Sequence, residues 1–374
     1  MSKYTFDEIA INCTEKKKPV ENDKYTYLGL EHLDSETLKV SRFGSEVAPI
    51  GEKLLMKKGD ILFGKRRAYQ KKVAIAPFDG IFSAHGMVLR PKVEVIDPDF
   101  FPFFISSDYF LDTAIKISVG SLSPTINWKD LNKLEFSLPS IEAQKENAKL
   151  LWAIQKTLEA YKDLISKQNM LVKSEIREIL KEKKSFTELR NYCDLSIETA
   201  KKSFKDDDDI LYVEISSIDN EINEIVNPTQ LLLKDAPESA KQVLKKGDVL
   251  VSLVRPNLKK IAVNKYPYNN VIGTSGFCIL RPNEKTTSSF IQAIVLSDDF
   301  TSKMESSVIG STYPTIKETN VLSYKVPIIS SEEMRKITNL IDAGDTIKIL
   351  LLECISELKA SYKKIMRDKI FKED

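Results

Sequence analysis

The sequence of 374 residues contains few of the residue types that most often build active sites or disulfide frameworks. It has two histidines and four cysteines, and no two cysteines form a Cys-x-x-Cys pair. This cysteine usage argues against a disulfide framework or a zinc cluster, so we expect no bound metal. No apolar run approaches the roughly 18 residues that cross a membrane, and residues 1–5 lack a secretory hydrophobic region. We therefore expect a cytoplasmic protein.

Signatures of nucleotide and cofactor chemistry are also missing. No Gly-x-x-x-x-Gly-Lys-Ser/Thr segment is present to hold a phosphate, and no Gly-x-Gly-x-x-Gly follows a predicted strand. Residues 227–230 begin with Asn-Pro, but they lack the second proline and the aromatic ring of an amino-methyltransferase loop. These absences favour a chain that binds and does not catalyse, with no cofactor of its own.

A long internal repeat is the clearest feature that the sequence does contain. Residues 120–126, Gly-Ser-Leu-Ser-Pro-Thr-Ile, return as Gly-Ser-Thr-Tyr-Pro-Thr-Ile at 310–316, a spacing of 190 residues. Solenoid repeats have periods of about 20–50 residues, so this spacing indicates two whole domains in tandem. Further matches in the same order are Lys-Lys-Gly-Asp at 57–60 and 245–248, and Leu-Arg-Pro at 89–91 and 280–282.

Each half of the chain begins with short segments bounded by Gly, Pro or Asp. Residues 25–30, 60–63 and 72–76 are rich in β-branched or aromatic side chains and predict strands. Residues 100–117 and 289–306 contain no glycine and place apolar groups at helical spacing, which predicts one helix in each. The globular part of each half is therefore expected to be α+β.

A long segment without proline closes each half. Residues 142–180 also lack glycine, and apolar side chains recur there at alternating steps of three and four, as in a heptad repeat. Gly344 interrupts the second copy, so we expect a short helix over 331–343 and a longer one after it. Two such helices can bury their apolar stripes against each other as an antiparallel coiled coil, or each can cap its own globular domain. The stripe residues are Leu151, Ile154, Leu158, Tyr161, Ile165, Val172, Leu351, Ile355, Leu358, Tyr362 and Ile365.

These patterns predict an α+β chain with a pseudo-twofold internal repeat. Its expected parts are a first globular domain at 1–140, a first helical spacer at 141–184, a second globular domain at 185–329 and a second helical spacer at 330–374.

Positive charge is concentrated in one segment of each half, although the formal net charge is only +2. Lys and Arg attract DNA phosphates, and Arg or Asn can also bond to base edges. The candidate DNA-binding residues are Lys65, Arg66, Arg67, Lys71 and Lys72 in the first copy, and Arg255, Asn257, Lys259 and Lys260 in the second. Most of these side chains differ between the copies while the surrounding motifs are kept. This difference predicts two modules that recognise two different short sequences.

The repeated Gly-Ser-x-x-Pro-Thr-Ile segment has two interpretations. Its hydroxyl groups could contact DNA phosphates. We favour the second interpretation, in which it is the turn that leads into the last strand of each domain and belongs to a frame that both copies share.

As a whole, this arrangement resembles the specificity subunit of type I restriction-modification systems. The resemblance rests on the duplicated Lys-Lys-Gly-Asp and Gly-Ser-x-x-Pro-Thr-Ile motifs and on their order. It also rests on residues 138–144, Leu-Pro-Ser-Ile-Glu-Ala-Gln, which are similar to the Leu-Pro-x-x-x-Glu-Gln start of the helical region in that family. The second copy departs from this pattern, because Met334 takes the place of the glutamine.

The resemblance implies a DNA-recognition role without catalysis. Each globular domain would be a target-recognition domain that reads one half of a bipartite, asymmetric DNA site. The paired helices would set the length of the spacer between the halves and dock two methylation subunits. These subunits would bring S-adenosylmethionine chemistry, and the restriction subunits would join the complex through them. Two alternatives stay open: a tandem interaction scaffold without DNA selectivity, and a stand-alone DNA methyltransferase or nuclease. The missing catalytic motifs disfavour the second.

Overall fold

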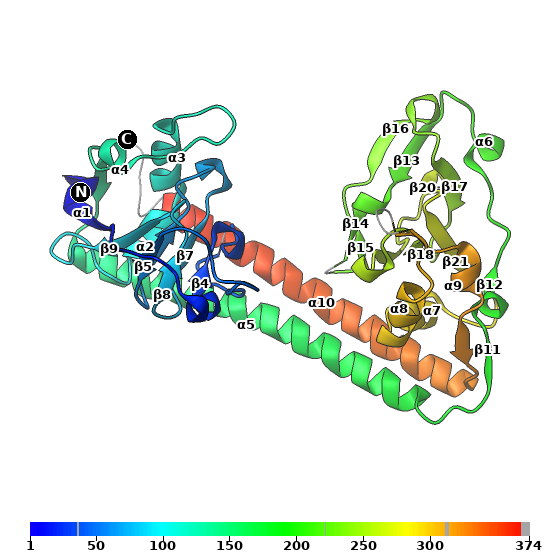
Figure 1. The fold of residues 1–374 in the computed structure, drawn as a ribbon. Helices are drawn as coiled ribbons and strands as arrows, with labels where there is room; N and C mark the ends of the chain where they lie inside the picture. Colours follow the sequence, from blue (N-terminus) through cyan, green and yellow to red (C-terminus); the bar gives the residue numbers. More distant parts are fainter. Residues whose placement is uncertain (36, 221, 311–313, 368–374) are drawn as a thin grey trace. The chain divides into compact units, whose positions relative to one another are not determined.

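The computed structural model describes residues 1–374 except 36, 221, 311–313 and 368–374 (Figure 1). The chain forms two compact units: Met1–Lys162 together with Glu353–Asp374 form unit 1, and Asp163–Leu352 form unit 2. Each unit contains one globular module and a portion of both long helices. We call residues 1–140 module 1 and residues 185–329 module 2.

Among the described residues, module 1 forms three sheets. Strands β1 and β10 pair antiparallel, so the two ends of the module meet. One four-stranded sheet has the order β2-β9-β6-β7, and the other has the order β3-β5-β8-β4 with β4 and β8 parallel. The strands are β1 (Ser2–Thr5), β2 (Ala10–Cys13), β3 (Lys16–Lys17), β4 (Tyr27–Leu28), β5 (Lys53–Met56), β6 (Ile61–Phe63), β7 (Val73–Ile75), β8 (Gly80–Phe82), β9 (Met87–Pro91) and β10 (Glu135–Leu138). Strands β6 and β7 confirm the predicted strands at 60–63 and 72–76. In the segment 25–30 only Tyr27–Leu28 form a strand, β4, and 3-10 helices lie on both sides of it.

Module 2 repeats this topology with additions (Figure 1). Its ends meet in the pair β11-β22, its first four-stranded sheet is β12-β21-β18-β19, and its second is β16-β13-β20-β17 with β13 and β20 parallel. Strand β16 at the edge and the small β14-β15 pair are the additions. Among the described residues no strand takes the place of β3, where Thr199 and Gln242 form an isolated bridge. The strands are β11 (Phe186–Glu188), β12 (Cys193–Asp194), β13 (Asp209–Val213), β14 (Ile218–Asp219), β15 (Glu224–Ile225), β16 (Thr229–Leu232), β17 (Ala240–Leu244), β18 (Val249–Ser252), β19 (Ile261–Val263), β20 (Val271–Thr274), β21 (Phe277–Pro282) and β22 (Lys325–Pro327).

The expectation of one helix in each of the segments 100–117 and 289–306 was wrong. Each segment forms two helices, because Ser107 and Ser297 adopt extended backbone and cap the second helix. The Ser107 hydroxyl accepts a hydrogen bond from the Phe110 N–H at 3.1 Å, an arrangement in which serine is strongly preferred. The short helices are α1 (Phe6–Ile9), α2 (Phe101–Ser106), α3 (Asp108–Lys116), α4 (Trp128–Leu131), α6 (Ala200–Ser203), α7 (Ser288–Val295), α8 (Asp298–Glu305) and α9 (Glu318–Leu322).

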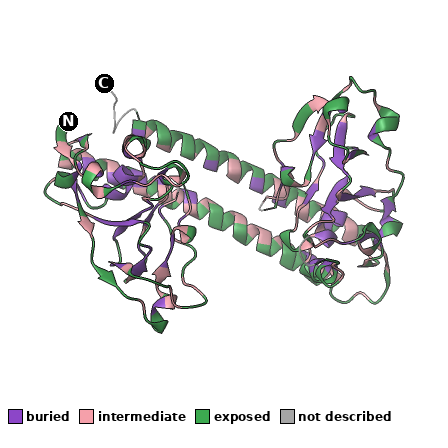
Figure 2. Ribbon diagram, turned by 45° about the horizontal axis from the view of Figure 1, so that its top comes forward, coloured by how far each residue is buried: buried purple, intermediate pink, exposed green. Residues whose placement is uncertain are grey.

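Buried residues are concentrated in the sheets and the adjoining helices of each module, coloured purple in Figure 2. The core of module 1 contains a cluster of aromatic rings in which Phe110 packs at 5.0 Å from Phe6 and at 5.4 Å from Phe136, between ring centroids. Such tilted ring pairs add to the free energy of burial itself. The corresponding core of module 2 is mostly aliphatic.

The two long helices are α5 (Ile141–Leu180) and α10 (Ser331–Ile365). The predicted break at Gly344 was wrong, since α10 is continuous and Gly344 is buried within it. A Cβ atom at Gly344 would lie 2.5 Å from Nε2 of Gln168 and 3.3 Å from Cγ2 of Val172. The glycine therefore gives α5 room to approach α10 within unit 2. This packing offsets the roughly 1 kcal/mol that glycine costs inside a helix.

The apolar stripe of the long helices is buried or half-buried at every residue named from the sequence. Leu151 and Tyr362 pack in the core of module 1, and Val172 packs against the core of module 2. The long helices thus pack against the globular modules. The alternative in which each helix caps a globular domain therefore holds in part. A coiled coil along the full helices stays a prediction. In the described part of the chain, no helix is both long and apolar enough to cross a membrane.

The close approach at Gly344 leads to a stability prediction. Replacing Gly344 by leucine should lower the free energy of unfolding by about 1–3 kcal/mol, because the side chain overpacks the contact with α5. Ala343→Leu is the control, since Ala343 is exposed one residue earlier in the same helix. Urea unfolding followed by circular dichroism measures both variants. An equal effect of the two would contradict the role of Gly344.

Candidate nucleic-acid interface

The basic segment of each module has the same unusual backbone. In module 1, Arg67 and Lys71 flank the 3-10 helix η3 (Ala68–Gln70) and have positive φ angles of 53° and 49°. In module 2, Arg255 and Lys259 flank η7 (Pro256–Leu258), both with φ of 48°. They are four of the six non-glycine residues with positive φ in the described part of the chain. Such a conformation costs about 1–2 kcal/mol per residue, and strain of this kind clusters at functional sites.

The repeated Gly-Ser-x-x-Pro-Thr-Ile segment holds this loop in place. The backbone N–H of Arg67 donates to the Pro124 carbonyl at 2.7 Å, and that of Arg255 donates to the Pro314 carbonyl at 2.8 Å. These contacts confirm that the motif belongs to a shared frame, although Ser311, Thr312 and Tyr313 lie outside the described residues. The motif does not lead straight into the last strand, because the short helices α4 and α9 intervene.

Two lysines of each basic segment bind protein atoms. The Lys71 ammonium lies 2.6 Å from Oδ1 of Asp108 and 2.7 Å from Oδ1 of Asp112, and Lys259 pairs in the same way with Asp298 at 2.8 Å. Burial acts to lower the pKa of Lys71, but its hydrogen bonds to the two carboxylates raise the pKa overall. These ion pairs tie the loop to the first residue of α3 or α8.

Lys72 and Lys260 also have matching contacts. The Lys72 ammonium donates to the Leu30 carbonyl at 2.7 Å, and the Lys260 ammonium donates to the Ile218 carbonyl. The sequence grouped these lysines with the DNA-binding candidates. In the structure, their charged groups join the basic segment to a neighbouring loop of the same module.

The other candidate DNA-binding residues form a surface that differs between the two modules. Arg66 and Arg67 are exposed in module 1, and Arg255 and Asn257 are exposed in module 2. Lys65 is half-buried, and burial together with the nearby charge of Lys16 lowers its pKa. The two modules therefore present different side chains from one backbone frame.

Sequence reasoning missed His85, which lies beside the basic segment of module 1. Nε2 of His85 is 3.4 Å from Nη1 of Arg66, and the Arg66 N–H donates to the His85 carbonyl at 3.2 Å. Burial lowers the pKa of His85, with further contributions from Arg66, Lys65 and Lys53. A local positive potential thus surrounds this side chain. Only the folding of β8 and β9 brings it to Arg66, so no sequence spacing could reveal the contact.

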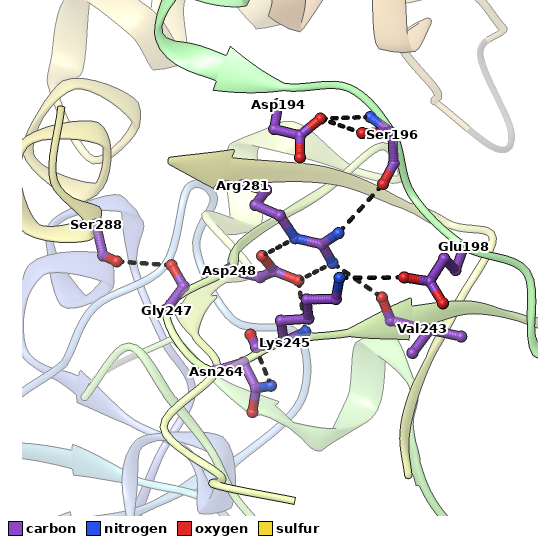
Figure 3. Close-up of polar contacts among 10 residues, drawn as sticks. All are labelled: Asp194, Ser196, Glu198, Val243, Lys245, Gly247, Asp248, Asn264, Arg281 and Ser288. Carbon is purple, nitrogen blue, oxygen red and sulfur yellow. Dashed lines mark hydrogen bonds and ion pairs between the residues drawn. The ribbon is translucent and has the colours of Figure 1, made fainter. Parts of the chain in front are cut away.

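An ion pair joins two of the repeated motifs in each module. In module 2, the guanidinium of Arg281 donates to both carboxylate oxygens of Asp248, at 2.9 and 2.8 Å (Figure 3). The same carboxylate accepts the Lys245 N–H at 2.7 Å. Arg90 and Asp60 repeat this pair in module 1 at 2.6 and 2.9 Å. The repeated Lys-Lys-Gly-Asp and Leu-Arg-Pro motifs are therefore the two sides of one contact.

Comparison with known proteins finds a family model that matches part of this chain. Residues 6–167 match the model described as the type I restriction modification DNA specificity domain. Within these residues the chain is similar to type I restriction-modification specificity proteins. The match covers module 1 and the first part of α5, which include the basic segment with its strained backbone.

Two curated relatives of this specificity family are similar to part of the chain. The type I restriction enzyme EcoDI specificity subunit of Escherichia coli is 30% identical over 165 residues, which cover 44% of this chain and 36% of that protein. The HindI specificity subunit of Haemophilus influenzae is 29% identical over 116 residues, covering 30% of this chain and 25% of that protein. The chain thus spans about a third or less of the length of the curated relatives that it matches.

Solved structures of this family support the fold along the whole chain. The S subunit of a type I restriction-modification system from M. genitalium matches with a TM-score of 0.56 and 16% identity, covering 100% of this chain and 96% of that chain. A chain from a study of assembly and conformational transition in a type I system matches with a TM-score of 0.56 and 18% identity, covering 98% and 96%. At this identity the likeness concerns the fold.

Proposed function

We propose that the protein is the DNA sequence-specificity subunit of a type I restriction-modification complex. Each module would read one half of a bipartite, asymmetric DNA site. The observation that carries this proposal is the duplicated loop in which two strained basic residues flank a 3-10 helix, with different exposed side chains in the two copies. A shared frame with different exposed groups suits two readers of different sequences, because base edges are distinguished by side-chain hydrogen bonds.

The long helices would give the subunit its second task. In this proposal α5 and α10 pair, fix the spacer between the two half-sites and dock two methylation subunits. The restriction subunits would join through the methylation subunits. The chain itself would be non-catalytic and act in the cytoplasm. Both curated relatives are specificity subunits of type I restriction enzymes, which supports this proposal.

The proposal is tested by assembling the full chain with the methylation subunit of a type I system from the same source. The complex is incubated with S-adenosylmethionine and a DNA library, and the methylated positions are mapped by sequencing. We expect methylation at one split motif with two fixed half-sites and an unspecified spacer. Methylation of unrelated sequences would contradict the recognition role. Methyl transfer by the chain alone would contradict the non-catalytic role.

A further inference from the structure

The two modules differ at a pair of neighbouring positions beside the shared loop. Module 1 has Arg66 and His85, where module 2 has Val254 and Gly276. Arg66 forms an isolated β-bridge with Thr125, and Val254 forms the same bridge with Thr315. Arg66 and Val254 therefore occupy equivalent places in the frame. His85 and Gly276 are equivalent too, because each donates its backbone N–H to the hydroxyl of the residue two positions earlier, Ser83 or Thr274, at 3.3 Å.

Both the backbone and the side chain of Arg66 contact His85. Its backbone N–H donates to the His85 carbonyl at 3.2 Å, and Nη1 of its guanidinium lies 3.4 Å from Nε2 of the ring. Burial and the nearby cations lower the pKa of His85, which favours its neutral ring. In the tautomer that carries the proton on Nδ1, Nε2 accepts a hydrogen bond from Nη1. The contact orients an otherwise flexible side chain before any ligand binds.

The orientation leaves one edge of the guanidinium for a ligand. Among the residues that the structure describes, no hydrogen bond occupies Nε or Nη2 of Arg66. The two N–H groups of this edge are parallel, and they match the O6 and N7 acceptors of guanine in the major groove. A phosphate would need no such fixed edge, since its charge attracts cations from any direction.

We propose that Arg66 reads a guanine in the half-site of module 1 and that His85 is its positioning residue. This inference rests on the proposed function and adds to it a base and the residues that select it. Module 2 has no guanidinium at the equivalent position. The methyl groups of Val254 there suit contact with a thymine methyl group, so the two half-sites differ at this position.

The inference is tested on the assembled complex with a library in which every position of the split motif is randomised. Arg66→Val, which introduces the side chain of module 2, should reduce the preference for guanine at one position of one half-site by about 5- to 150-fold. The preferences at the other half-site should not change. Lys116→Ala, at an exposed lysine of α3 outside the basic segment, is the control for loss of one positive charge.

A pair of His85 variants separates positioning from a merely structural role. His85→Ala should reduce the same guanine preference by a smaller factor, about 3- to 10-fold, because Arg66 loses its acceptor but keeps its charge. His85→Gln should restore most of the preference, since its amide oxygen can accept from Nη1. Equal melting temperatures of the three proteins would show that the fold is not the cause.

The outcomes separate this inference from the proposed function. A split motif with no guanine position sensitive to Arg66→Val would overturn the inference and leave the proposed function intact. A uniform loss of affinity for all sequences would also overturn it, since that result identifies Arg66 as a phosphate contact. A wild-type complex that methylates no split motif would overturn the proposed function itself.

Discussion

Replacing Asp248 by alanine is expected to lower the free energy of unfolding of unit 2 by about 3–5 kcal/mol. Asp248 is 1% exposed, and Arg281 donates two hydrogen bonds to it from a guanidinium that is also nearly buried. Without the carboxylate, a positive charge stays in the interior with only the carbonyls of Ser196 and Val243 as partners. The loss is large because the remaining charge cannot reach water. Urea unfolding, followed by circular dichroism, measures it.

The repeat provides a matched comparison for this prediction. Asp60→Ala removes the equivalent carboxylate of module 1, but the Arg90 side chain is 38% exposed and can be hydrated. We therefore expect a smaller loss of about 1–3 kcal/mol. Asp207→Ala removes an exposed partner of Lys234 and should change stability by less than about 0.5 kcal/mol. If all three variants lost the same stability, burial of the ion pair would not be the cause.

Parts of the fold that depend on repetition and periodicity could be predicted from the sequence. The heptad spacing predicted α5 almost to its ends, and the repeat predicted two modules with one topology. The errors at Ser107 and Gly344 have different origins. Ser107 ends one helix and caps the next through a local hydrogen bond from the Phe110 N–H. The helix continues through Gly344 in contact with Gln168 and Val172, which lie far away in the sequence.

For the candidate site too, the sequence predicted the location but not the contacts of the individual side chains. Composition located both basic segments, because clustered cations are visible in the sequence. It could not separate Arg66, whose guanidinium is exposed, from Lys72, which bonds to a carbonyl 42 residues earlier in the chain. The strained backbone at Arg67 and Lys71 was also beyond the sequence, since neither residue is a glycine or an asparagine that favours positive φ. Backbone strain and side-chain partners emerge only when the loop is folded.

The Lys65, Arg66 and Arg67 side chains together should provide much of the affinity of module 1 for DNA. Replacing all three by alanine should weaken binding of the assembled complex by about 10²- to 10³-fold near 0.1 M salt. Each phosphate contact releases condensed counterions, so the slope of log K against log salt concentration should also fall by about 2 to 3. Fluorescence anisotropy with a labelled duplex over a range of salt concentrations measures both quantities.

The triple variant should lose affinity for the half-site of module 1 only. In the triple variant, mismatches in the half-site of module 1 should cost little further affinity, because the contacts that they disrupt are already absent. Mismatches in the half-site of module 2 should keep their full cost, since Arg255 and Asn257 are unchanged. Replacing the exposed Lys116, Lys129 and Lys133 of the same module removes the same charge and should have a much smaller effect. Equal sensitivity at both half-sites would show that the two modules do not read DNA separately.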